Sequence, residues 1–402
     1  MNRLRVFRAA MVVFLIAPML SGISSYAFHE GGEGYCEGCH TIVSSQDSQD
    51  SSATGSSGTV SPRLILKGSD PSSTCLLCHA KRGEAYSVLT NDGSAFNPGG
   101  DYYWLQKTFS WTIQGISYQS RADSHGHNIV ALDYGLNSDG RVSHAQGGTY
   151  PAAAMGCTSC HDPHAKTTGK AGSQGTTPVT SAYGEEPSTK TPPGTFRLLG
   201  GVGYEGGQLA SGVTFRYAAP IAEASSFGWI ETDSNHTAYG SGMSEWCANC
   251  HGNFLNGNVG PQKKSHPSGN NAKITSKYAN NYNSYISTGE LSGGQASVYL
   301  ALVPFEVGTT SAALLDPSSS SGPGYSGSAN VMCLTCHRAH ASAFQSMGRW
   351  DFGATLMADS HPQAGDGGAS GTDALNSYYG RNMSAEFGEN QRQLCNKCHL
   401  KD

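Results

Sequence analysis

All twelve cysteines of the chain occur in pairs with two residues between them, and each pair is followed at once by a histidine. In c-type haem attachment, two thiols bond to the vinyl groups along one porphyrin edge, and the next residue places its imidazole on the iron. The spacing therefore predicts six covalently bound haem c groups. The attachment residues are Cys36 and Cys39, Cys75 and Cys78, Cys157 and Cys160, Cys247 and Cys250, Cys333 and Cys336, and Cys395 and Cys398.

Two other uses of paired cysteines explain less of this pattern. A disulfide framework is the usual interpretation of an even cysteine count in an exported chain, but it gives no reason for the histidine after every pair. Structural zinc would need further ligands at finger-like spacing, and every thiol here already belongs to an adjacent pair. Haem attachment accounts for the whole set. The proximal iron ligands are then expected to be His40, His79, His161, His251, His337 and His399.

The nine remaining histidines exceed the six second ligands that six irons need. Methionine is an alternative ligand that raises the reduction potential, but Met155, Met243 and Met332 lie on the same segments as their motifs and approach the wrong face. The surplus favours bis-histidine iron throughout. We expect distal ligands at His29, His127, His164, His266 and His340. His236 and His361 are further candidates, and three of the four residues His125, His144, His236 and His361 would be spare.

Two of these histidines lie three residues beyond a proximal one: His164 follows His161, and His340 follows His337. The attachment segment already covers one face of its own haem, so an imidazole this close does not reach the opposite face. It does reach a neighbouring haem, which would join adjacent porphyrins through one short peptide and favour rapid electron hopping. The alternative for each is an ordinary surface or hydrogen-bonding histidine.

The composition leaves room for such cofactors in the interior. Hydrophobic residues make up only 37% of the chain while 52 of its 402 residues are glycine, so an aliphatic core would be thin for this length. Porphyrin faces would supply part of the missing apolar interior. The net charge of -5 and the low share of charged residues, 14%, predict neither a basic nucleic-acid-binding face nor an acidic tail.

The first 27 residues have the features of a secretory signal peptide. Three arginines precede the apolar run 9–20, and small residues suitable for cleavage follow at 25–27. The run contains Pro18 and is too short to span a bilayer, which disfavours a transmembrane anchor. We expect residues 1–27 to be removed and residues 28–402 to form one exported hexahaem domain without a membrane span.

The elements that position these groups should be short and irregular. The motifs follow one another at unequal intervals, which disfavours a solenoid and favours one chain threaded around a haem stack. The predicted fold class is a multihaem cytochrome c, mostly coil, with short helices and a few short strands wrapped round that stack. The expected helices are 245–254, 273–287 and 341–358, and the expected strand pair is formed by 195–204 and 213–219.

Several long segments resemble the OmcS-type hexahaem cytochromes of metal-reducing bacteria, a family of extracellular cytochrome nanowires. The matching stretches include "GHNIVA", "CHDPH", "GMSEWCANCH", "CHRAHAS" and "QRQLCNKCHLKD", and the likeness extends over nearly the whole chain after the signal peptide. The resemblance implies filaments in which parallel and T-shaped haem pairs form a continuous line that carries electrons to minerals, electrodes or other cells. It also implies little regular secondary structure and bis-histidine haems. The family's distal ligands match His29, His127, His164, His266 and His340.

One position departs from that family. Its members carry a histidine three residues after the first motif, which coordinates a haem of the neighbouring subunit, whereas this sequence has Val43 there. His236 and His361, which the family pattern lacks, are candidates to supply the missing ligand within the chain, or a ligand comes from elsewhere on another copy. We expect the subunit interface to be retained with altered ligation.

The sequence thus predicts an electron carrier, not an enzyme, that acts outside the cell or on its outer surface after passing through the periplasm. Its expected partners are further copies of itself, other multihaem cytochromes, and extracellular metal oxides or electrodes. One alternative is a multihaem reductase, which needs an iron with an open distal site; such sites often have lysine in place of the motif histidine, and all six motifs here end in histidine. The other alternative is a monomeric electron shuttle.

Overall fold

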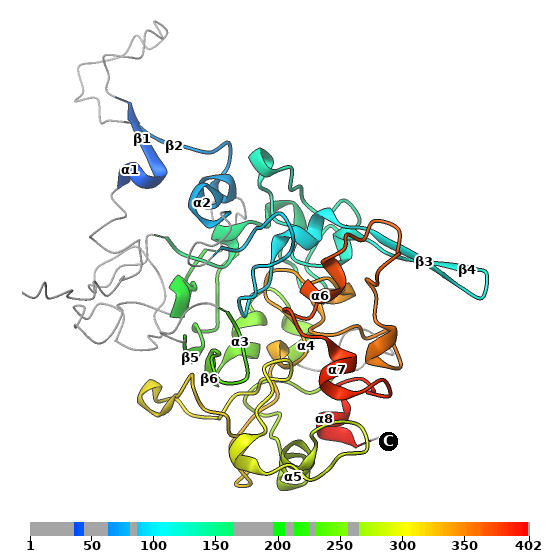
Figure 1. Ribbon diagram of the computed structural model, residues 1–402. Helices are drawn as coiled ribbons and strands as arrows, with labels where there is room; N and C mark the ends of the chain where they lie inside the picture. Colours follow the sequence, from blue (N-terminus) through cyan, green and yellow to red (C-terminus); the bar gives the residue numbers. More distant parts are fainter. Residues whose placement is uncertain are drawn as a thin grey trace, which may run out of the picture.

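The protein is described here by a computed structural model that covers residues 36–43, 63–80, 87–163, 196–205, 213–224, 230–255 and 265–400. Most of these residues lie in turns and coil (Figure 1). The helices are α1 Cys36–Cys39, α2 Pro71–His79, α3 Met243–Cys247, α4 Gly252–Leu255, α5 Ser276–Ser284, α6 Asp373–Asn376, α7 Met383–Phe387 and α8 Asn396–His399. The strands are β1 His40–Val43, β2 Arg63–Leu66, β3 Phe109–Ile113, β4 Ile116–Ser120, β5 Ile221–Glu223 and β6 Ala238–Ser241. Short 3-10 turns join them.

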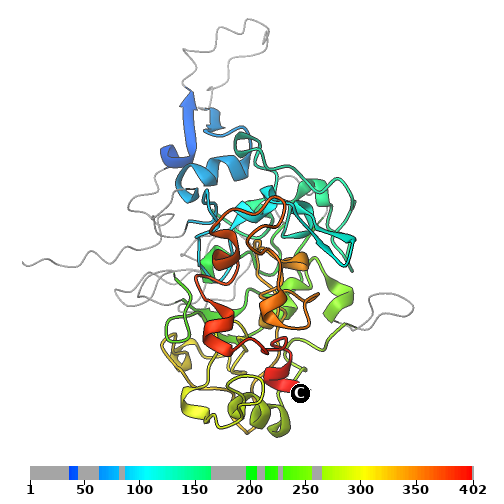
Figure 2. The same ribbon diagram turned by 45° about the vertical axis from the view of Figure 1, so that its right-hand side comes forward.

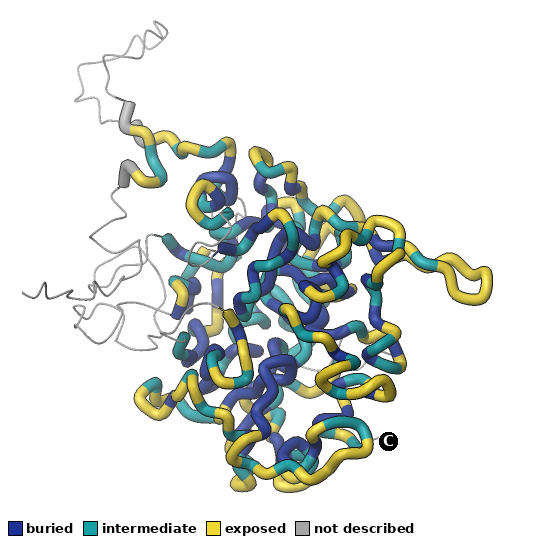
Figure 3. The backbone as a smooth tube through the Cα atoms, viewed as in Figure 1, coloured by how far each residue is buried: buried dark blue, intermediate teal, exposed yellow. Residues whose placement is uncertain are grey.

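The strands form three separate antiparallel pairs, β1 with β2, β3 with β4, and β5 with β6. The β3–β4 hairpin turns at Gln114 and Gly115, both of which have positive φ, as a two-residue hairpin turn requires. It projects from the body of the molecule, and the residues toward its tip are exposed (Figure 3). At its base Trp111 stacks on His361 with ring centroids 3.9 Å apart. Isolated two-stranded pairs of this kind do not build a core, so each pair only joins neighbouring parts of the chain.

Helix α2 shows why a haem-attachment motif can be helical. Asp70 caps its N-terminus by accepting a hydrogen bond from the Ser73 backbone N–H at 2.8 Å, and Pro71 occupies the first turn, where no donor is needed. The helix ends at His79, so its last turn contains the whole second motif. The caps therefore fix the direction in which this motif presents its thiols.

Two of the three helices expected from the sequence are present in shortened form. Segment 245–254 overlaps α3 and α4, and segment 273–287 contains α5. The helix expected at 341–358 was wrong: apart from the 3-10 turn Gln345–Met347 and the start of a second at Met357, the segment is extended or coiled, and Ser346 and Met347 have positive φ. The segment follows the fifth motif, and its Ser346 carbonyl contacts His337 of that motif. In a helix this carbonyl would point along the helix axis and lose that contact.

The expected strand pair 195–204 with 213–219 was also largely wrong. Within the described parts of these segments the only ladder-like contacts are Gly203 N–H to Phe215 O at 2.9 Å and Phe215 N–H to Tyr204 O at 2.7 Å. Residues Phe196–Leu198 instead form a 3-10 turn with Arg197 and Leu198 at positive φ. As at 341–358, the segment provides a backbone carbonyl for a motif histidine, here that of Arg197 for His161, and does not join a sheet.

The apolar interior is divided into several clusters, and attachment cysteines lie at their margins. The largest cluster contains Trp104, Tyr282 and Trp350, with Cys157, Cys336 and Cys398 packed against it. Cys160 and Cys247 border a second cluster, and Cys250 borders a third. Thioether-linked porphyrins would therefore extend these clusters. The fold class predicted from the sequence, mostly coil with short helices and strands, is confirmed.

The first and last motifs lie at opposite ends of the molecule. Helix α1 and the strands β1 and β2 occupy one end, and α8 lies beside α5 at the other, an arrangement that both ribbon views show (Figures 1 and 2). Among the described residues no helix is both long and apolar enough to cross a membrane.

Candidate haem-binding sites

The first three motifs are neighbours in space as well as in sequence. Burial raises the pKa of the Cys39 thiol, and Cys75 and Cys78 of the second motif lie close enough to raise it further. The Cys75 side chain in turn forms a hydrogen bond with Cys157 of the third motif. The second motif therefore lies near the first motif and is hydrogen-bonded to the third.

The remaining motifs continue this order. Burial raises the pKa of Cys160 to about 12, with a contribution from Cys250 of the fourth motif. Cys247 forms a hydrogen bond with Cys333 of the fifth motif. Burial also raises the pKa of Cys336 to about 12, and the two cysteines of the sixth motif add to that effect. Two of the five junctions between consecutive motifs are thus hydrogen-bonded, and at the other three the cysteines are near enough to affect one another electrostatically. The six attachment sites therefore follow one another in space in chain order.

Two of these junctions are built in the same way. Three residues before its first cysteine, the second motif has Ser72 and the fourth has Ser244, and each hydroxyl accepts a hydrogen bond at 3.0 Å from a cysteine N–H of the following motif, Cys157 or Cys333. Sequence reasoning missed this role, although the signal Ser-x-x-Cys-x-x-Cys-His at 72 and 244 is visible in the chain. The second and third motifs form one matched pair, and the fourth and fifth another.

In both the third and the fifth motif, a backbone carbonyl from a later segment of the chain orients the proximal histidine. The Nδ1 of His161 contacts the carbonyl of Arg197 at 2.8 Å, and the Nδ1 of His337 contacts that of Ser346 at 2.7 Å. Both carbonyl residues have positive φ, 50° and 58°. The left-handed conformation turns each carbonyl toward the imidazole, at a cost of about 1–2 kcal/mol for a non-glycine residue. No sequence pattern announces these positions, because neither is a glycine.

Three proximal histidines face a second histidine across a gap that fits one iron. The ring centroids are 6.3 Å apart for His161 and His340, 6.0 Å for His251 and His127, and 6.0 Å for His399 and His266. With metal–nitrogen bonds of about 2 Å and each nitrogen about 1 Å from its ring centre, two imidazoles on one iron have centroids about 6 Å apart. All three pairs therefore fit bis-histidine coordination.

The second nitrogen of these rings is held by backbone carbonyls. Nδ1 contacts Ala339 O at 2.7 Å in His127, Gln146 O at 2.7 Å in His251 and Pro267 O at 2.8 Å in His266. A carbonyl accepts only from a protonated Nδ1, which leaves the lone pair of Nε2 for a metal. Burial lowers the pKa of His127 to about 4 and that of His340 to about 3. Both imidazoles are therefore neutral, as metal ligation requires.

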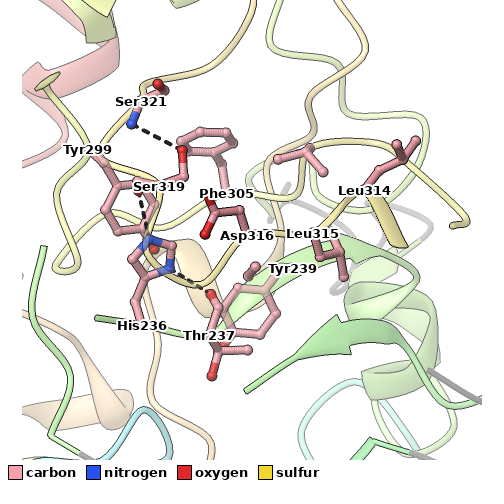
Figure 4. Close-up of a pocket in the computed structure, with 12 residues that line it drawn as sticks. His236, Thr237, Tyr239, Tyr299, Phe305, Leu314, Leu315, Asp316, Ser319 and Ser321 are labelled. Carbon is pink, nitrogen blue, oxygen red and sulfur yellow. Dashed lines mark hydrogen bonds between the residues drawn. The ribbon is translucent and has the colours of Figure 1, made fainter. Parts of the chain in front are cut away.

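Two buried histidines have no nitrogen to offer. His125 uses Nε2 for Ser120 Oγ at 2.7 Å and Nδ1 for Trp104 O at 3.0 Å. His236 lines a small cavity of about 100 Å³, stacks on Tyr299, and uses Nδ1 for Thr237 O and Nε2 for Ser319 O, each at 3.0 Å (Figure 4). These contacts make both residues structural, and they leave His236 unsuited to the distal role.

The other spare histidines are held outside the line of motifs. His361 contacts Asp366 Oδ2 through Nδ1 at 2.7 Å and stacks on Trp111, which makes it a support of the β3–β4 hairpin. His144 is exposed and contacts Ser143 Oγ at 2.9 Å. His29 and His164 lie outside the described residues. Within the described part of the chain, the aromatic ring that His337 contacts is Phe352, with centroids 5.6 Å apart, and no histidine takes the place that His340 has opposite His161.

The chemistry of the surroundings fits haem and not the two alternatives. The eleven cysteines that the structure describes are free, so no disulfide framework joins them. Nor do the described residues hold any group of three or more histidine, cysteine or acidic side chains suited to a zinc ion. Two adjacent buried donors, Arg349 Nη2 and Trp350 Nε1, have no acceptor in the structure. The propionate groups of a porphyrin are acceptors of the kind that such donors need.

These observations define a class, the multihaem c-type cytochromes, in which a largely coiled chain wraps a line of attachment motifs. No protein-family model matches the chain. Its sequence is 38% identical over 431 residues to the C-type cytochrome OmcS of Geobacter sulfurreducens, and the match covers 98% of this chain and 99% of that protein. The chain therefore belongs to the OmcS family of c-type cytochromes.

Two solved structures are similar to this one over 93% of this chain and 100% of theirs, with a TM-score of 0.73 and 36% sequence identity. One is the outer membrane cytochrome S filament from Geobacter sulfurreducens, and the other is a cryo-electron microscopy structure of OmcS nanowires from the same organism. The family resemblance predicted from the sequence is thereby confirmed.

Proposed function

We propose that the protein is an electron carrier with six haem c groups that polymerises into an extracellular filament. The observation that carries the proposal is the succession of neighbouring motifs in space, from Cys39 near one end of the molecule to Cys398 near the other. Haem iron exchanges single electrons between its ferric and ferrous states. A line of haems that reaches both ends of a subunit serves transport only when an electron donor stands at one end and an acceptor at the other, and further copies of the chain provide both.

The paired imidazoles support a specific ligand assignment for three haems. His340 completes the iron of the third motif, His127 that of the fourth, and His266 that of the sixth. His340 follows the fifth motif and reaches back to the third. By the same spacing, His164 after the third motif reaches back to the first, and His29 is then left for the second.

This assignment leaves the iron of the fifth motif without a histidine from its own chain. Three residues after the first motif, where the third and fifth motifs have histidine, the chain has Val43. His236 contacts carbonyls through both nitrogens, and His361, whose contact with Asp366 through Nδ1 leaves Nε2 for a metal, does not lie opposite His337. We therefore propose that the sixth ligand of the haem at His337 comes from a neighbouring copy, at a position other than that of Val43.

Carbon monoxide binding tests this proposal, because the gas binds ferrous haem that lacks a sixth protein ligand. Dissociated, reduced protein should bind one carbon monoxide per chain, and the same protein assembled into filaments should bind none. Electron microscopy of the same samples reports the state of assembly. If concentrated wild-type protein stays monomeric in the micrographs, the filament is refuted and the shuttle is favoured.

The same titration separates the conduit from the reductase. A reductase keeps its open iron in every state, so binding of carbon monoxide in intact filaments would favour an enzyme acting on a small oxidised substrate.

We further propose that residues 1–27 direct export and are removed, that residues 28–402 form the hexahaem domain, and that the mature chain acts outside the cell after crossing the periplasm. Its electron acceptors would be metal oxides, electrodes or other cytochromes.

A further inference from the structure

Next to the fifth motif, the interior holds a group of three charged side chains that the ligand assignment does not use. Glu231 accepts hydrogen bonds from Arg338 Nη1 and from Arg349 Nη1, the latter at 3.0 Å. The three side chains are 2%, 2% and 0% exposed. Burial favours the neutral form of Glu231, but the two guanidinium groups outweigh it and lower its pKa, so the carboxylate stays ionised. We call these three residues the Arg–Glu–Arg cluster.

The cluster carries a net positive charge. Arginine is always protonated in proteins, so two positive charges meet one negative charge. No other carboxylate among the described residues contacts either guanidinium; Arg338 lies over the Tyr379 ring at 3.8 Å. The protein's own side chains leave this charge unbalanced, and Arg349 Nη2, which has no protein acceptor, is the donor that would meet a haem propionate. Apolar side chains of similar volume would be at least as stable, so stability alone does not explain the group.

The cluster is anchored on the fifth motif itself. Arg349 Nε donates to the carbonyl of Leu334 at 2.7 Å and to that of the proximal ligand His337 at 3.2 Å, and its N–H donates to Cys336 O at 2.8 Å. Arg338 directly follows His337 in the chain.

We propose that the Arg–Glu–Arg cluster raises the reduction potential of the haem attached at Cys333 and Cys336. Oxidation of that iron adds one positive charge beside a buried positive charge, and the low dielectric of the interior strengthens the repulsion. The ferrous state is favoured accordingly. In the third motif the residue whose N–H donates to the second cysteine carbonyl is Gly200, where the fifth motif has Arg349. The third motif therefore lacks this positive charge, and the two matched pairs are electronically different.

The test uses opposite changes of charge at the same place and rests on the proposed haem content. Arg349→Met removes a positive charge and should lower one of the six fitted reduction potentials by at least 59 mV, a tenfold change in the one-electron equilibrium. Glu231→Gln removes the negative charge and should raise the same potential. Arg349→Lys keeps the charge and should stay close to the wild type.

Spectroelectrochemical titration of the purified six-haem protein gives these potentials. Arg381→Met is the matched control, because Arg381 is also largely buried but pairs with Asp233 and Glu386, so its loss should leave the six values unchanged. Shifts of Arg349→Met and Glu231→Gln in the same direction, or no shift in either, would overturn the inference. A variant that fails to fold is recognised by its haem content, and Arg349→Lys then decides whether charge or packing is responsible. Failure of the proposed function would appear in the wild type, as fewer than six haems per chain.

Discussion

In assembled filaments, where the wild type should have no open iron, replacing His340 by alanine should create one open iron in six. His340 faces His161 alone, with ring centroids 6.3 Å apart, so its loss removes one axial ligand from one haem. About one-sixth of the haem should become high-spin when oxidised and bind carbon monoxide when reduced, with the other five unaffected. The ring also stacks on Tyr102 at 5.0 Å, and emptying this buried site should cost about 2–4 kcal/mol of stability.

The matched control is His125→Ala. His125 is fully buried, whereas His340 is partly buried, and burial lowers the pKa of His125 to about 4; both nitrogens of His125 contact protein atoms. Its loss leaves Ser120 and Trp104 without a partner and should destabilise the fold by a similar amount, about 2–4 kcal/mol, without any new carbon monoxide site. Optical and electron paramagnetic resonance spectra of both variants, each normalised to haem content, measure the difference. An entirely low-spin His340→Ala protein that binds no carbon monoxide would refute the reasoning.

Three further predictions concern stability and assembly. Burial raises the pKa of Glu306 from 4.5 to about 7. The neutral carboxyl therefore stabilises the fold below pH 4.5, and this contribution of about 3 kcal/mol is lost as the pH rises to 7. Denaturant titrations at both pH values should show that Glu306→Gln removes this pH dependence of stability, and an unchanged dependence would contradict the assignment. Gly100 has φ +96° and a Cβ there would overlap the Ala341 carbonyl, whereas nothing lies within 4 Å of a Cβ at Gly115, φ +81°; Gly100→Ala should therefore lower the melting temperature clearly more than Gly115→Ala, and equal effects would speak against a close approach. Val43→His restores a histidine three residues after the first motif and should lower the protein concentration at which filaments appear in electron micrographs; an unchanged threshold would show that this position does not reach a neighbouring copy.

Part of the secondary structure followed from the sequence and part did not. Helix α5 forms inside segment 273–287, where the buried residues Ala279, Tyr282 and Asn283 share one helix face, although serine, tyrosine and asparagine are weak helix formers. Segment 341–358 has comparable local preferences, but Arg349 and Trp350 are drawn into the interior and Ser346 turns its carbonyl to His337. Tertiary contacts outweigh propensities of a few tenths of a kcal/mol per residue.

The sequence by itself determined the haem c chemistry of the chain, and it predicts the attachment cysteines and the proximal ligands. These features are local, because two thiols and an imidazole must lie within five consecutive residues to hold one porphyrin edge and its iron. It also indicated a mostly coiled chain, since the glycine-rich composition offers few periodic apolar patterns. The family followed from long matching segments, which are far more specific than any single motif.

Only the tertiary structure decided the order of the motifs in space and which histidine faces which iron. The carbonyl that orients His127 belongs to Ala339, 212 residues away, and no local pattern encodes such a contact. The same holds for His236, which looked available in the sequence but whose Nε2 contacts the carbonyl of Ser319, 83 residues away. A proximal ligand is fixed by covalent spacing, whereas a distal ligand is fixed by the packing of segments that meet only when the whole chain has folded.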